Sequence, residues 1–330
     1  MRNYVLRRLA LMVPTIFVIT IVVFLSIRLI PGSAVEMMAI EMGSRESTGG
    51  QMDIAAVEKM LGMDVPVHIQ YVRWIGVWPQ DDGSFQGIFQ GDFGTSLWLK
   101  RPVLPEIAAR LPVTFELGLM AFIISQCVAL PIGLLSAIRQ DSAADFFGRS
   151  FAIISLSIPG FWLGTMIMVF PAIWWGWAPP LNLIRFTDDT LGNLGQFIIP
   201  ATLMGMAMSA TTMRMLRTTM LEVLRQDYIR TAWSKGMRER IIVIRHALRN
   251  ALIPVVTMIA GQIPIMIGGS VIMEQIFALP GMGRLFLDSI NRRDYPFVSS
   301  INILLASFGL VLILLVDLSY AYLDPRIRYK

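Results

Sequence analysis

The sequence predicts an all-α membrane protein with six transmembrane helices, and three observations support this fold class. The 330 residues have a mean hydropathy of +0.62. Only 15% of them are charged, whereas a soluble domain carries about 25%. Six apolar stretches are each long enough to cross about 30 Å of hydrocarbon as helices, the form expected because unpaired backbone groups cannot face lipid. These stretches are residues 9–30, 113–138, 150–175, 197–217, 251–274 and 299–321.

The first stretch is predicted to be a retained transmembrane helix, so that residues 1–30 form the N-terminus and the first span. It begins with a basic head that includes Arg7 and Arg8, as a signal peptide does. The apolar run from Leu9 to Ile27 is longer than a typical signal core, however, and no small-x-small cleavage site follows it.

The second segment, residues 31–112, is too long for a bare loop and is expected to form a small external domain. Residues 54–76 look helical, whereas residues 80–97 are rich in Gly and Asp. Residues 113–330 then hold the other five spans, with a long cytoplasmic loop at residues 218–250.

The distribution of Lys and Arg predicts that both termini are cytoplasmic. With this orientation the cytoplasmic segments hold seventeen Lys and Arg residues, nine of them between Arg214 and Arg249. The outer segments hold ten, and six of these fall in residues 31–112, which are long enough for the rule to discount them. The same orientation places the tryptophans of residues 174–177 at the outer interface, where an aromatic belt is expected.

The spans lack charged residues over most of their length, which disfavours several transporter classes. Asp, Glu, Lys and Arg are absent from residues 9–27, 117–136, 151–174, 197–213, 251–273 and 299–316. Ion-coupled carriers and voltage sensors need ionisable groups inside the membrane, so both are disfavoured. Selective channels often have a carbonyl filter motif or a charged ring. Neither is found in this sequence, although Glu274, near an outer end, is a candidate member of such a ring.

The chain is expected to have no catalytic activity of its own. None of its four lysines is followed by Ser or Thr, so it has no P-loop, and the GxSxG, HExxH and CxxC patterns are absent. One Cys and two distant His residues argue against a transition-metal site. The net charge of +5 fits membrane topology and lipid contact better than nucleic-acid binding.

The cytoplasmic loop at residues 218–250 is expected to form two short helices that break at Gly236, where a left-handed backbone is easily adopted. At 100° per residue, three arginines share one face of the second helix and an apolar stripe lies apart from them. The arginines are Arg238, Arg245 and Arg249, and the stripe is Ile241, Ile244 and Leu248. Two interpretations follow. The loop is an amphipathic segment on the inner membrane surface, or it is a docking element that exposes residues 230–236 to a partner.

Several motifs, in order along nearly the whole chain, resemble the ABC-importer permeases of the dipeptide, oligopeptide and nickel group. RTAWSKG followed by RHALRNALIP resembles the EAA-type cytoplasmic loop of that group, although the first loop position, often Glu in the wider superfamily, is Arg230 here. The other matching segments are RRLALMVPTIFVITIVVFLSIRLIPG, LGMDVPVHIQYVRWIG, GDFGTSL, IPGFWLG, EQIFALPGMGRLFLDSINRRDYPFV and DLSYAYLDPRIR.

This resemblance implies a type I ABC-importer permease in a bacterial or archaeal plasma membrane. The chain is then one of two homologous permease subunits, with two ABC ATPase subunits that bind ATP and Mg, and an external substrate-binding protein. Residues 113–330 are the permease core by this reading. Peptides are the leading substrate class, followed by nickel complexes, glutathione-like compounds and oligosaccharides. The alternatives are a stand-alone channel and, more remotely, a membrane enzyme.

The resemblance and the loop composition together give the candidate functional residues. The residues predicted to couple to the ATPases are Tyr228, Arg230, Thr231, Ala232, Lys235 and Gly236. In this assignment Gly236 permits the turn and Ala232 allows close approach of the partner. Polar residues predicted to line the pathway are Ser209, Thr212, Gln262 and Ser270. Taken singly, each of these more often packs between helices.

Overall fold

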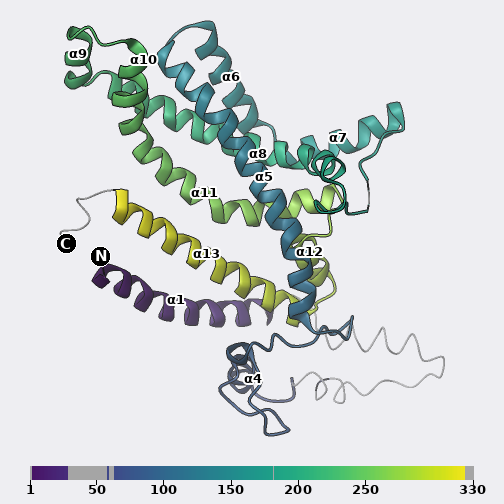
Figure 1. Cartoon of the computed structure of the whole chain (residues 1–330). Helices are drawn as coiled ribbons and strands as arrows, with labels where there is room; N and C mark the ends of the chain where they lie inside the picture. The colour runs from purple at the N-terminus through teal and green to yellow at the C-terminus, as the bar shows by residue number, and fades with distance from the viewer. Residues whose placement is uncertain (1, 29–57, 59–62, 181, 324–330) are drawn as a thin grey trace. The chain divides into compact units, whose positions relative to one another are not determined.

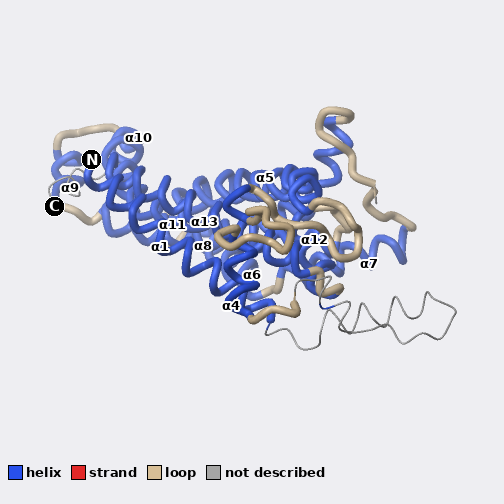
Figure 2. The backbone as a smooth tube through the Cα atoms, turned by 90° about the horizontal axis from the view of Figure 1, so that it is seen from below, coloured by secondary structure: helices blue, strands red, loops and turns tan. Residues whose placement is uncertain are grey.

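The computed structural model describes residues 2–28, 58, 63–180 and 182–323, and within these residues the secondary structure is helical (Figures 1 and 2). The one extended pairing among them is an isolated bridge between Thr95 and Pro102. The chain divides into two compact units. The core unit is mainly Arg110–Arg284, and the second unit is built from the described parts of Leu6–Ala109 and from Leu285–Phe308.

The core unit is a bundle organised around one long helix, α8 (Thr190–Leu224). This helix packs most extensively against α11 and α6, and also against α7. Its first turn is capped by Asp189, whose carboxylate accepts a hydrogen bond from the backbone N–H of Gly192 at 3.0 Å. The other elements are α5 (Val103–Ile138), α6 (Ala143–Ser157), α7 (Gly160–Trp175), α9 (Asp227–Ser234), α10 (Glu239–Ile241), the π-helix η2 (Ile242–Leu248) and α11 (Arg249–Ile276).

Small residues let α5 and α8 approach closely. A Cβ atom on Gly205 of α8 would lie 2.8 Å from the carbonyl oxygen of Ala121, and one on Gly133 of α5 would lie 3.0 Å from that of Met213. Ala201 and Ala210 are also fully buried. Close backbone packing through Gly and Ala is the usual way in which membrane helices associate, because the hydrophobic effect gives no driving force between helices inside lipid.

The described helices account for up to six candidate spans, and the third of these is not a single helix. Among the residues that the structure describes, five helices are long and apolar enough to cross a membrane, and the pair α6 and α7 becomes the sixth candidate span if it is counted as one. The two helices are bent by 86° at Ile158 and Pro159, where Ile158 is extended (φ −93°, ψ 120°). A proline disfavours the helical region for the preceding residue, and it has no N–H to continue the ladder.

Several helices extend well beyond the apolar stretches that predicted them. Helix α5 begins at Val103 rather than near residue 113, and α8 covers Thr190–Leu224 rather than 197–217. The 36 residues of α5 span roughly 54 Å at about 1.5 Å per residue, which exceeds the hydrocarbon thickness. Hydropathy marks only the part of a helix that suits lipid, and charged residues such as Glu106 still lie on the helix beyond that part.

The second unit contains α1 (Arg2–Arg28), α4 (Val67–Ile75), the 3-10 helix η1 (Ile88–Gln90), most of α12 (Met282–Asn291) and the start of α13 (Tyr295–Leu323). Helix α4 packs on α1 through aromatic contacts. The ring centroid of Phe24 lies 5.2 Å from that of Tyr71 and 5.4 Å from that of Trp74. The Tyr71 hydroxyl also lies 2.8 Å from Thr20 Oγ1.

Residues 80–97, the Gly- and Asp-rich stretch of the predicted external domain, are held at their C-terminal end by polar contacts to the α12–α13 turn. The Asp294 carboxylate accepts hydrogen bonds from Ser96 Oγ and from the Leu97 N–H. Just beyond the stretch, Trp98 Nε1 donates to the carbonyl of Arg292 at 2.7 Å. Burial raises the pKa of the Asp294 carboxyl above its usual value. The helical character expected over residues 54–76 is confirmed for Val67–Ile75, while most of residues 31–62 lie outside the described part of the chain.

Candidate functional site

The segment predicted to be a cytoplasmic docking loop folds into a compact module at one end of the core unit. Helix α8 continues to Leu224, and the short helix α9 then runs over Asp227–Ser234. The chain turns at Gly236 before α10, η2 and α11 follow without interruption (Figure 1). The predicted break at Gly236 is confirmed: its φ is +72°, and a Cβ atom there would meet nothing within 4 Å. Backbone conformation, rather than lack of space, therefore favours glycine.

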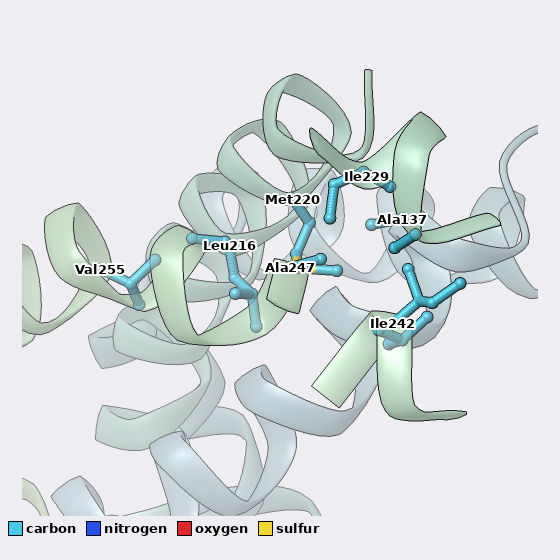
Figure 3. Packing of buried hydrophobic residues seen from close by; sticks show 10 residues of the cluster. Ala137, Leu216, Met220, Ile229, Ile242, Ala247 and Val255 are labelled. Carbon is cyan, nitrogen blue, oxygen red and sulfur yellow. The ribbon is translucent and has the colours of Figure 1, made fainter. Parts of the chain in front are cut away.

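Helix α9 is fixed to the bundle by its apolar face. Ile229 is 0% exposed and Ala232 is 7% exposed. Both belong to a cluster that we call the coupling core, which joins α9 to the ends of α5, α8 and α11 and to η2 (Figure 3). The other buried members are Ala137, Leu216, Met220, Ile242, Val243, Ala247, Ala251 and Val255.

Two hydrogen bonds between helices accompany this apolar packing. Asn250 Nδ2, at the start of α11, donates to the Tyr228 hydroxyl of α9 at 2.9 Å. Thr219 Oγ1 of α8 donates to the carbonyl of Ala251 at 3.1 Å in a buried position. The end of α8, helix α9 and the start of α11 are thus joined by polar as well as apolar contacts.

The opposite face of α9 is exposed. Five of the six predicted coupling residues lie on it or at its end: Tyr228, Arg230, Thr231, Lys235 and Gly236. Arg230 has one weak ion pair, 3.6 Å from Asp227, and both side chains are largely exposed. Trp233, which is 48% exposed, also lies on this surface, within the predicted docking range 230–236 but outside the six predicted coupling residues. In the sequence, Trp233 lies between Arg230 and Lys235. A large apolar side chain that stays exposed between two cations is typical of a surface that binds a partner.

The expected exposure of Ala232 is wrong. Its side chain points into the coupling core rather than toward a partner. The sequence spacing indicates this burial, because Ile229 and Ala232 are three residues apart and therefore share one face of a helix. Its small size serves the close packing of α9 on its own chain.

The predicted arginine and apolar faces after Gly236 also differ from the structure. Residues Ile242–Leu248 form a π-helix with i→i+5 hydrogen bonds, so the angle of 100° per residue does not apply across them. Ile242, Val243 and Ala247 are buried, whereas Ile241 and Ile244 of the expected stripe are exposed. Arg238 precedes α10 as its N-cap residue, so it does not share a helical face with the later arginines.

The four predicted pathway residues are buried inside the core unit. Gln262 Nε2 of α11 lies 3.2 Å from Thr212 Oγ1 of α8, so the structure brings these two together. Ser209 Oγ donates to the carbonyl of Met206 at 2.7 Å, and Ser270 Oγ donates to the Glu274 carboxylate at 2.9 Å. Each side chain has a hydrogen-bond partner within the chain. Their role in a pathway stays a prediction.

Glu274, considered above for a charged ring, is fully enclosed by protein. Its carboxylate accepts hydrogen bonds from Thr114 Oγ1 at 2.7 Å and from the backbone N–H of Arg284 at 2.9 Å, as well as from Ser270. A Cβ atom on Gly281 would overlap the carboxylate. This carboxylate therefore joins the ends of α5, α11 and α12. Within the described residues, no cluster of three or more His, Cys, Asp or Glu is arranged to hold a metal ion.

Comparison with known proteins identifies the family. Residues 129–329 match the family described as binding-protein-dependent transport system inner membrane component, and residues 1–118 match the N-terminal region of such membrane components. A glutathione transport system permease protein of Salmonella paratyphi A (strain ATCC 9150 / SARB42) is 36% identical, with 100% of both chains covered. A Brucella abortus (strain 2308) protein assigned as a peptide transport system permease is 37% identical, again with 100% of both chains covered.

The helical fold also matches a solved transporter. The crystal structure of an amino acid ABC transporter with histidines superposes with a TM-score of 0.53 at 14% sequence identity, over 66% of this chain and 94% of that chain. The match extends the agreement from sequence to the arrangement of helices. With two family matches, full-length relatives and this shared fold, the chain belongs to the binding-protein-dependent transport system inner membrane components and is a permease subunit of an ABC importer.

Proposed function

We propose that this chain forms half of the translocation pathway of an ATP-driven peptide importer in a bacterial or archaeal plasma membrane. A second, homologous permease subunit forms the other half. Two ABC ATPase subunits bind ATP and Mg and hydrolyse the nucleotide, and an external binding protein delivers the substrate. The lack of a P-loop in this sequence supports the assignment of hydrolysis to partner chains.

Peptides are the substrate class that the comparisons favour. The full-length relatives carry names that refer to glutathione and to peptides, and glutathione is itself a small peptide. The described spans offer uncharged polar side chains such as Thr212 and Gln262 rather than charged ones at their centres. A lightly polar route suits a transporter that leaves substrate selection to its binding protein.

The geometry of α9 carries the mechanistic part of the proposal. An eight-residue helix is too short to be stable alone, so its position depends on the coupling core and on the bond between Tyr228 and Asn250. Its exposed face presents Arg230, Thr231 and Lys235 to a partner. A helix that is fixed on one side and free on the other transmits displacement to the spans.

The proposed cycle follows from this arrangement. When the ATPases close around ATP, they move α9, and the coupling core moves the ends of α8 and α11 with it. Rigid helices then convert this displacement into a change of access from one side of the membrane to the other, as in other rigid-body switches. Gly236 allows the chain to reverse direction after α9, and Ala232 holds α9 to its own chain rather than contacting the ATPase.

The test is a mild-detergent purification of this chain from its native membrane, followed by mass spectrometry. The proposal expects two P-loop ATPase chains and a second six-span protein to co-purify, and vesicles reconstituted with the complex to take up peptide only with ATP. Recovery of this chain alone after crosslinking, together with ATP-independent flux, would support a stand-alone channel. The basic loop would then be an amphipathic segment at the membrane surface.

A further inference from the structure

A buried ion pair joins α6 to α8 in the core unit. Asp145, near the start of α6, is 0% exposed, and Arg217 of α8 is 18% exposed. Arg217 Nε donates to Asp145 Oδ1 at 2.7 Å, and its terminal Nη2 donates to Oδ2 at 2.9 Å. This two-pronged geometry fixes both the distance between the helices and the rotation of one relative to the other.

The Asp145 carboxylate also accepts hydrogen bonds from α5 and from the turn between α5 and α6. Ser136 Oγ of α5 donates to Oδ1, and the backbone N–H of Asp141 donates to Oδ2 at 3.0 Å. Arg149 lies one turn further along α6, with its Nε 3.6 Å from Oδ1. One carboxylate therefore joins the end of α5, the turn between α5 and α6, the first turns of α6, and α8. We call this group the α6–α8 clamp.

The clamp lies next to the coupling core along α8. Leu216 and Met220, which flank Arg217 on this helix, are both fully buried members of that core. The helix ends at Leu224 and α9 begins at Asp227, so about ten residues of mainly helical chain, roughly 15 Å, separate Arg217 from the start of α9. A displacement of α9 thus reaches Arg217 through the short turn at Arg225 and Gln226 and then along α8.

Beyond the clamp, α6 leads directly to the break in the third span. The helix ends at Ser157, and α7 starts at Gly160 with an 86° change of direction. On the other side of this break, α7 packs against α11 as well as α8. The break is a point at which α6 is able to change its angle without moving α7 by the same amount, since no continuous backbone ladder crosses it.

We infer that the Asp145–Arg217 pair is a positioning pair that makes α6 move as one body with α8 and α9 during transport. This inference rests on the proposed docking role of α9. A buried ion pair is a weak source of net stability compared with apolar packing, so its geometry is the more informative property. Through it, α6 follows the ATPase-driven movement of α9, and the break before α7 converts that movement into a change of angle within the third span.

The experiment measures whether α6 and α9 keep a constant separation in the assembled complex. Spin labels are attached to an Ala144→Cys, Gln226→Cys variant in a Cys127→Ala background, since both labelled positions are exposed and belong to α6 and to the start of α9. Distances are recorded without nucleotide and after trapping with Mg-ATP and vanadate. The clamp is then removed by the double substitution Asp145→Asn, Arg217→Gln, which neutralises both charges together and leaves no unpaired one. Arg214→Gln, one turn earlier on α8 and exposed, is the matched control.

In the chain with the clamp and in the Arg214→Gln control, the distance between the two labels should be the same without nucleotide and after trapping. In the double variant this distance should differ between the two states. Stimulation of ATP hydrolysis by the co-purified binding protein should fall by roughly 5- to 150-fold, the range of ordinary coupling free energies. A constant distance in the double variant, or full stimulation, overturns the inference. If the double variant does not assemble, the same distances are measured in Arg217→Lys, which keeps the charge and loses the two-pronged geometry. A state-dependent distance is expected there too, and a constant one overturns the inference. Failure of ATPases to co-purify with the unsubstituted chain would instead refute the docking role of α9.

Discussion

Truncation of Ile229 to Ala should release α9 from the bundle without unfolding the spans. Ile229 is 0% exposed in the coupling core, and replacing such a residue by Ala costs about 2–5 kcal/mol. An isolated helix shorter than about 12 residues is marginal in water, so this loss falls on the docking of α9. At about 1.4 kcal/mol per factor of ten, the released population should rise by roughly 30- to 4,000-fold.

Hydrogen exchange followed by mass spectrometry is the assay. In the Ile229→Ala variant, amides of residues 227–234 should exchange faster by a factor in that range, while amides of α5 and the middle of α8 keep their protection. The matched control is Ile241→Ala in α10, because the same truncation at a side chain that is 41% exposed should change stability by less than about 0.5 kcal/mol. Unchanged exchange at residues 227–234 would refute the conclusion that α9 depends on its buried face.

Three further predictions concern single positions. Gly236→Pro should uncouple ATP hydrolysis from uptake, because proline fixes φ near about −65° where the turn needs +72°; normal uptake per ATP hydrolysed would contradict this. Burial raises the pKa of Asp294, so its stabilising contribution is complete below the ordinary carboxyl pKa of about 4 and is lost as the pH rises through the raised value. The melting temperature relative to Asp294→Asn should therefore be more favourable near about pH 4 than near about pH 8, and the opposite trend would refute the assignment. Gly281→Ala should destabilise by about 1–3 kcal/mol because its Cβ overlaps the Glu274 carboxylate, whereas Gly261→Ala in open space should not; equal thermal unfolding of the two variants would contradict the overlap.

The helical class and the approximate positions of the candidate spans were readable from hydropathy, but the break in the third span was not. Pro131, Pro171 and Pro200 lie inside continuous helices, whereas Pro159 separates two helices bent by 86°. Each proline removes one backbone donor, so the local chemistry is the same. Whether the helix continues is decided by packing, in this case of α6 on α8 and of α7 on α11, and that packing brings together residues far apart in the sequence.

The turn within residues 218–250 was predicted at the correct residue, while the inner contacts of this segment were only partly predictable. The turn at Gly236 follows from the local preference of glycine for a left-handed backbone. The π-helix that places Ile242 and Ala247 in the coupling core depends on tertiary packing. Arg217 was counted only as a basic residue in the topology, because its partner Asp145 is 72 positions away and no local pattern links the two.

The enclosure of Glu274 has a consequence for the order in which the chain is assembled. Its nearest side-chain donor, Thr114, is 160 residues earlier in the sequence, so α5 is synthesised long before α11. Glu274 lies near the end of α11, and a carboxylate there that enters the membrane without hydrogen-bond donors is costly to bury. A nascent chain that has already placed α5 offers a hydroxyl donor to this carboxylate as α11 arrives. Vectorial synthesis from the N-terminus therefore brings the donor before the acceptor, and a circularly permuted chain that began after α5 would have to insert α11 with Glu274 lacking that donor.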